Sequence, residues 1–153
     1  FYISECRFST NVVRPDSGSV EMTSETKEKI RALYELLHIG RKDQAAREQQ
    51  MRRNFEFFGA PTALFIFVHS GLKEFSALDA GIFAQTLMLS AHARGLGTCA
   101  QGALSTWDNV VRKEFEVPEG YRFLYGIAIG YPSDAPINDF GAHRLDIEEI
   151  VLR

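Results

Sequence analysis

Hydrophobic side chains point in nearly every direction around a helical axis over residues 77–94, the longest apolar stretch of the chain. At its start, Ser76 and Asp79 have the spacing of a capping box, whose side chains satisfy free N–H groups of a first helical turn. Gly95 is suited to end the helix, because glycine readily takes the left-handed conformation that closes helices. A helix that is apolar all round must be covered all round. We therefore expect a buried helix that shares its cover with a second subunit.

Two shorter apolar runs predict strands. Residues 62–68 (TALFIFV) are continuously apolar and rich in β-forming residues, which predicts a central strand that is buried on both faces. Residues 121–131 (YRFLYGIAIGY) predict a second central strand. Within it, Gly126 and Gly130 indicate places where another part of the chain approaches the backbone closely.

Two helices are predicted before the first strand. One begins at Thr23 or Ser24, has a single apolar stripe and ends at Gly40. The other covers residues 42–58, which are polar over most of their length and apolar at the end. The stripe of the first helix has helical spacing and consists of Ile30, Leu33, Tyr34 and Leu37.

The remaining segments complete a mixed set of elements. Residues 98–104 are expected to be part strand and part loop, and Ser105 with Asp108 forms a second capping box before another helix. Residues 145–152 predict a short terminal helix, or a helix and a strand. Helices and strands in this order predict the α+β class, with a mixed sheet flanked by helices.

Length, charge and cysteine content narrow the function. The chain of 153 residues has the length of one domain, and its net charge of −3 argues against nucleic acid as a partner, because phosphate binding needs a positive excess. The apolar run 60–68 is too short to cross a bilayer, and the long helix carries charged residues, so we expect no membrane span. Two cysteines form no disulfide framework, which suits a reducing cytoplasm.

Side chains with catalytic or metal-binding chemistry are scattered along the sequence. The four histidines lack the spacing that brings two ligands onto one helical face, so we expect no metal site. Motifs of hydrolases and of phosphoryl-transfer enzymes are absent, and no catalytic side chain is assigned. Cys99 is a possible nucleophile, but the tendency of cysteine to be buried favours a position in the core.

Residues 95–100 match the glycine pattern of dinucleotide-binding proteins. That pattern functions between a strand and the helix that starts inside it, so that a pyrophosphate meets the N–H groups of the helix. Here the glycines follow a helix. We therefore interpret Gly95 as the residue that closes the helix and Leu96 as folding back on its last turn.

Three backbone-rich features remain: residues 97–102, residues 130–132, and His143 with Arg144 after a flexible loop. Exposed N–H groups of a glycine-containing loop can bind carbonyl or ring-nitrogen edges, and an arginine can hold a phosphate. These features suit the binding of a flat cofactor better than acid–base catalysis.

Residues 57–151 resemble the flavin-dependent nitroreductase family in the order and spacing of several motifs. The motifs are FFGAP, LDAGIFAQTLMLSAHARGLGTCAQGAL, VVRKEFEVPEG, GIAIGYP and an arginine before LDIEEIV. The segment LYELLHIGRKDQAAREQQMRRNFEFFGAP further resembles the nitrobenzoate-reductase branch. The resemblance implies an α+β homodimer with FMN at the subunit interface. It also implies hydride transfer from NADH or NADPH to nitroaromatics, quinones or related acceptors by a ping-pong mechanism.

The resemblance also assigns residues to the cofactor. The family's loop that borders the isoalloxazine falls on Ala100, Gln101, Gly102 and Ala103, and its phosphate-binding arginine falls on Arg144, next to His143. Two alternatives stay open at this point. Gln101 could only cap a strand, and Arg144 could be an ordinary surface charge.

The start of the chain departs from the family. Members open with an R-R-S-x-R motif that holds the FMN phosphate, and here Arg7 and Ser9 belong to a degenerate relative of it. The family's P-S-G-x-N-x-Q-P-W stretch has no clear copy. We therefore divide the chain into a divergent or incomplete segment, 1–22, and a nitroreductase-like domain, 23–153. A flavin-binding or scaffold protein without turnover is the alternative to an enzyme.

Overall fold

A computed structural model describes residues 24–141 and 147–151 of the chain. These form two compact units. One consists of residues 48–132, and the other of residues 24–47 with 133–141 and 147–151. The predicted division at residue 22 lies outside the described residues and stays a prediction.

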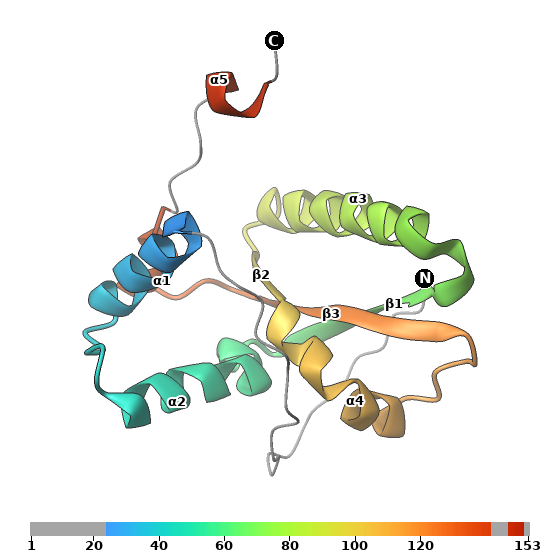
Figure 1. Cartoon of the computed structure of the whole chain (residues 1–153), viewed down its shortest axis with the longest axis horizontal. Coiled ribbons are helices and arrows are strands. Elements are labelled where there is room, and N and C mark those ends of the chain that lie inside the picture. Colours follow the sequence, from blue (N-terminus) through green and yellow to red (C-terminus); the bar gives the residue numbers. More distant parts are fainter. Residues whose placement is uncertain (1–23, 142–146, 152–153) are drawn as a thin grey trace. The chain divides into compact units, whose positions relative to one another are not determined.

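Three antiparallel strands form the sheet of the first unit: β1 (Thr62–His69), β2 (Gly97–Gln101) and β3 (Tyr121–Gly130). Their order is β1-β3-β2, so β1 and β2 run in the same direction on either side of β3 (Figure 1). Both predicted strands and the α+β class are confirmed. The sheet was expected to be mixed, but β3 separates the two strands that run in the same direction, and every pairing among the described strands is antiparallel. Among the described strands β3 is therefore central, as predicted, whereas β1, which was also predicted to be central, is an outer strand.

Both faces of the sheet are covered. Phe65 and Phe67 of β1 belong to one buried cluster, and Ile66 and Val68 belong to the other. Helix α3 (Lys73–His92) covers the second cluster, whereas α4 (Asp108–Glu114) lies across the opposite face (Figure 1). The alternation explains why the sequence of β1 is apolar without interruption, as expected for a strand buried on both faces.

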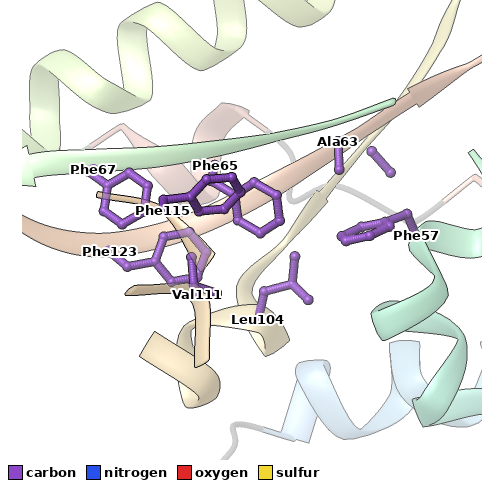
Figure 2. Packing of buried hydrophobic residues seen from close by; sticks show 9 residues of the cluster. Phe57, Ala63, Phe65, Phe67, Leu104, Val111, Phe115 and Phe123 are labelled. Carbon is purple, nitrogen blue, oxygen red and sulfur yellow. The ribbon is translucent and has the colours of Figure 1, made fainter. Parts of the chain in front are cut away.

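Aromatic rings fill most of the cluster beneath α4. Phe65 lies between Phe115, which directly follows α4, and Phe123 of β3, with ring centroids 5.1 and 5.7 Å away (Figure 2). The cluster consists of Phe57, Ala63, Phe65, Phe67, Leu104, Val111, Phe115, Phe123 and Ala128. This core holds β1, β3 and α4 together.

Helix α3 starts earlier than predicted. It follows the short 3-10 helix η2 (Ser70–Leu72) and begins at Lys73, so Ser76 lies inside it. The Ser76 hydroxyl donates to the carbonyl oxygen of Lys73 at 2.8 Å instead of capping the N-terminus. Ser76 is buried against the rest of the unit, and burial of its hydroxyl is compatible with this bond to the preceding turn.

The end of α3 confirms the interpretation of Gly95. Gly95 has a φ of 74°, and its N–H donates to the carbonyl of His92 at 3.0 Å. The N–H of Leu96 donates to the carbonyl of Ala91 at 3.0 Å, which completes a Schellman motif. Strand β2 follows at once, so these glycines do not present a helix N-terminus to a pyrophosphate.

The predicted helix over residues 42–58 is wrong as one continuous element. Helix α2 (Gln44–Arg52) begins after Asp43, whose carboxylate accepts the N–H of Ala46 at 3.0 Å, and it is followed by the 3-10 segment η1 (Arg53–Gly59). Within η1, Phe57 and Phe58 have φ values of 50° and 53°. This turn directs Phe57 into the core, with its ring 6.0 Å from that of Phe65.

A 3-10 segment, η3 (Gly102–Trp107), joins β2 to α4. The capping box expected at Ser105 and Asp108 is not formed, because the Ser105 hydroxyl donates to the carbonyl of Gly102 at 2.7 Å. The Asp108 carboxylate instead connects α4 to β3. It accepts the N–H of Phe123 at 3.3 Å and pairs with Arg112 at 2.6 Å.

The second unit contains the remaining elements. Helix α1 (Ser24–Leu36) confirms the first predicted helix, although it ends before Gly40 and His38 takes the left-handed conformation with a φ of 56°. Helix α1 lies beside η4 (Pro136–Asp139). Helix α5 (Ile147–Ile150) is the short terminal helix.

The close approaches predicted at two glycines of β3 are present. A Cβ atom at Gly126 would lie 2.4 Å from Cδ1 of Leu104, and one at Gly130 would lie 2.9 Å from Cδ of Pro61. We expect Gly126→Ala to lower the free energy of unfolding by about 1–3 kcal/mol, because the added methyl group overfills the core. Urea unfolding of the wild type and the variant measures this difference.

Gly81→Ala is the matched control, because a Cβ atom there meets no other atom within 4 Å. In a Leu104→Ala background the added methyl group at Gly126 should cost less, since the clashing side chain is gone. Equal costs of Gly126→Ala in both backgrounds would contradict the proposed clash.

Candidate functional site

The exit of β2 brings together the four residues predicted to border a flat cofactor. Ala100 and Gly102 are exposed, Ala103 is half-buried and Gln101 is buried. Strand β2 is an outer strand of the described sheet, so alternate backbone N–H and C=O groups point away from β3. A Cβ atom at Gly102 would meet nothing within 4 Å. Residues 100–103 therefore form an open edge of backbone, which we call the β2 edge.

The Gln101 side chain extends into the protein. It is 2% exposed, and its Nε2 donates to the backbone carbonyl of Asn54 at 2.7 Å. Because that carbonyl only accepts hydrogen bonds, the bond determines which amide atom faces it. The other amide atom, Oε1, is buried and has no hydrogen-bond partner among the described residues. Gln101 is thus more than a strand cap, since its side chain connects β2 to η1.

Sequence reasoning missed the part played by Asn54. The contributing atom is a backbone carbonyl, and the two residues are 47 positions apart in the chain. A backbone acceptor has no residue-type signature. Its proximity to Gln101 depends on the fold.

The other end of β2 is closed by the exit of β3. Gly97 pairs with Gly130, and a Cβ atom at Gly97 would lie 3.5 Å from Cβ of Pro132. Tyr131, which lies between Gly130 and Pro132 in the chain, is 83% exposed. Two of the three backbone-rich features found in the sequence therefore meet along β2.

Cys99 is exposed on β2, so its expected position in the core is wrong. Burial along β2 does not alternate, because Cys99 and Ala100 are both exposed and only Gln101, at the end of the strand, is buried. Partial desolvation raises the pKa of the Cys99 thiol above its usual value. The reactive thiolate is therefore disfavoured, which does not support a nucleophilic role.

Arg7, Ser9, His143 and Arg144 all lie outside the described residues. Within the described part of the chain, no cluster of three or more His, Cys, Asp or Glu side chains could hold a metal ion. No helix in that part has the length and apolar character needed to span a membrane.

A hollow lies in the second unit, along α1 and the segment that follows it. Its volume is about 600 Å³, and side chains of both charge signs line it. The Arg47 guanidinium lies 4.2 Å from the ring centre of Tyr34, as in a cation–π pair. The mixed charges favour no particular class of ligand.

Comparison with known proteins identifies the family. The model of the nitroreductase family matches residues 19–131. The chain belongs to the nitroreductase family. It is 37% identical over 122 residues to 4-nitrobenzoate reductase of Pseudomonas putida, covering 78% of this chain and 54% of that protein.

A second relative agrees in sequence and in structure. Nitroreductase NfnB of Mycolicibacterium smegmatis is 35% identical over 118 residues, covering 76% of this chain and 50% of that protein. The crystal structure of the FMN-dependent nitroreductase NfnB from Mycobacterium smegmatis in complex with NADPH superposes with a TM-score of 0.82 and 29% identity. It covers 91% of this chain and 64% of that one. The chain spans about half the length of the curated relatives it matches.

The described residues fit the ring edge of a flavin. The β2 edge has free space above Gly102 and lies on the side of β2 away from β3 in the described sheet, and the isoalloxazine carries donors and acceptors along its pyrimidine edge. Residues 100–103 would border the ring.

Proposed function

We propose that the protein is an FMN-dependent oxidoreductase that takes hydride from NADH or NADPH and passes it to nitroaromatic, quinone or similar acceptors by a ping-pong mechanism. Membership of the nitroreductase family supports this proposal. The structural observation that carries it is the open β2 edge beside the buried Gln101 amide. FMN, when bound, supplies the redox chemistry, and the protein binds and orients it.

The roles of the residues follow from this proposal. The backbone of Ala100, Gln101, Gly102 and Ala103 borders the flavin ring and hydrogen-bonds its polar edge. Arg144 and His143 bind the phosphate, with Arg7 and Ser9 as further contacts. Such a site needs no catalytic acid or base of its own, which agrees with the scattered titratable side chains.

We further propose a homodimer in which α3 packs against the α3 of a second copy. The fully buried residues of α3 are small and face the sheet, where Phe83 and Leu87 also pack partly buried, whereas the outward side carries a stripe of large apolar residues with 59–76% exposure. The inward residues are Ser76, Ala80, Ala84 and Ala91, and the outward stripe is Phe75, Leu78, Ile82 and Leu89. Large apolar side chains at helical spacing are typical of an interface, and the cysteine usage and the nicotinamide donor favour a cytoplasmic location.

Titration of the purified full-length protein with FMN tests the cofactor before the chemistry. We expect uptake of FMN, yellow protein, and oxidation of NADH or NADPH that depends on a nitroaromatic such as 4-nitrobenzoate. A protein that binds no FMN would contradict the proposal. FMN binding without oxidation of either nicotinamide would favour a flavin-binding scaffold.

A further inference from the structure

The turn that contacts Gln101 has an unusual backbone. Phe57, Phe58 and Gly59 in η1 all have positive φ values, of 50°, 53° and 82°. Non-glycine residues seldom take this conformation, and two in succession persist only where the surroundings hold them. The ring of Phe57 is held in the core against Phe65, so one end of η1 has a defined position. The carbonyl of Asn54, three residues earlier, is the point at which η1 is bonded to β2.

Gln101 joins this turn to the β2 edge. Its side chain is buried and bonded to Asn54, while its backbone pairs with Gly126 of β3 and continues directly into the exposed Gly102. A residue with its side chain anchored inside and its backbone at an open edge determines where that edge lies. Gln101 Oε1, which has no hydrogen-bond partner among residues 24–141 and 147–151, adds a buried acceptor.

We propose that Gln101 is a positioning residue. Its amide ties the β2 edge to η1 through the Asn54 carbonyl and thereby sets the position of the backbone groups of residues 100–103 that meet the flavin. This inference rests on the proposed function. It assigns the side chain of Gln101 to the support of the site and leaves contact with the ring to the backbone.

The charged residues around the hydrogen bond between Gln101 and Asn54 are exposed, so a carboxyl group introduced at Gln101 can test this bond. The charged residues of η1, Arg53 and Glu56, are exposed, and Arg122 is exposed near the start of β3, whereas Gly126 lies in the middle of that strand. In a Gln101→Glu variant, burial would therefore dominate the pKa of the new carboxyl and raise it. When protonated, this carboxyl can donate to the Asn54 carbonyl. When ionised, it repels that oxygen.

The test measures the dissociation constant of FMN by quenching of its fluorescence in the full chain. For Gln101→Glu we expect binding about tenfold weaker than wild type at pH about 8 and close to wild type at pH about 5.5. Gln101→Met, which lacks both polar atoms, should bind about tenfold more weakly at both pH values. Wild type in the same buffers corrects for titration of the FMN phosphate.

Gln49→Glu, on the exposed side of α2, is the matched control for the added charge and should behave as wild type. Melting temperatures of the FMN-free variants show whether each one folds. Wild-type FMN affinity in Gln101→Met, or failure of Gln101→Glu to recover at low pH, would overturn the inference. If wild type itself binds no FMN, the proposed function fails instead.

Discussion

Leu78→Glu is expected to abolish the proposed homodimer. Leu78 belongs to the outward stripe of α3 and is 60% exposed in the single chain. If a second copy covers this stripe, an ionised carboxylate there loses its hydration without gaining a partner, which is costly. We expect the dissociation constant of the dimer to rise at least about a hundredfold, as measured by sedimentation equilibrium.

Asn109→Glu provides the matched control, because it adds the same charge on the exposed side of α4. It should leave the dimer intact. FMN affinity should fall in Leu78→Glu together with dimerisation, since the resemblance to the family implies a flavin at the subunit interface. A wild-type protein that is monomeric at micromolar concentration would contradict the proposed homodimer. The outward stripe of α3 would then be covered by another part of the chain.

Phe65→Ala is expected to have the largest effect on stability. The Phe65 side chain is 1% exposed and packs against the rings of Phe57, Phe115 and Phe123 (Figure 2). Truncation removes this buried surface and leaves a cavity where three elements meet, which costs about 3–5 kcal/mol. Domains have only about 5–15 kcal/mol of stability, so the variant should unfold at a much lower urea concentration.

Tyr131→Ala is the control for loss of an aromatic ring. Tyr131 is 83% exposed, so its truncation should change the free energy of unfolding by less than about 0.5 kcal/mol. Urea unfolding followed by circular dichroism measures both variants. Similar midpoints for Phe65→Ala and Tyr131→Ala would show that the aromatic cluster does not hold the unit together.

Helix α3 shows how far an apolar pattern can be interpreted. The pattern predicted a helix and its glycine stop, and both are confirmed. It did not show that the small residues would be fully buried against the sheet while Phe75, Leu78, Ile82 and Leu89 stay exposed, because both kinds are apolar. The start was wrong by four residues, since α3 begins at Lys73 directly after η2 and Ser76 bonds to the preceding turn.

Sequence reasoning predicted only part of the candidate site. Residues 100–103 were identified through resemblance to the family, and the fold places them at an open strand edge. The contact between Gln101 and Asn54 was missed, and Cys99 was placed in the core although it is exposed. Whether a residue of a short strand is buried depends on the segments that pack against it, such as η1 against Gln101.

The sequence by itself determined which segments become strands and helices, because hydrophobic periodicity and glycine stops act over a few neighbouring residues. The tertiary structure alone decided the strand order, the left-handed turn at Phe57 and Phe58, and the direction of the Gln101 side chain. These features depend on packing between residues that are far apart in the chain. Such packing can hold a strained backbone or choose one face of a strand against local preference.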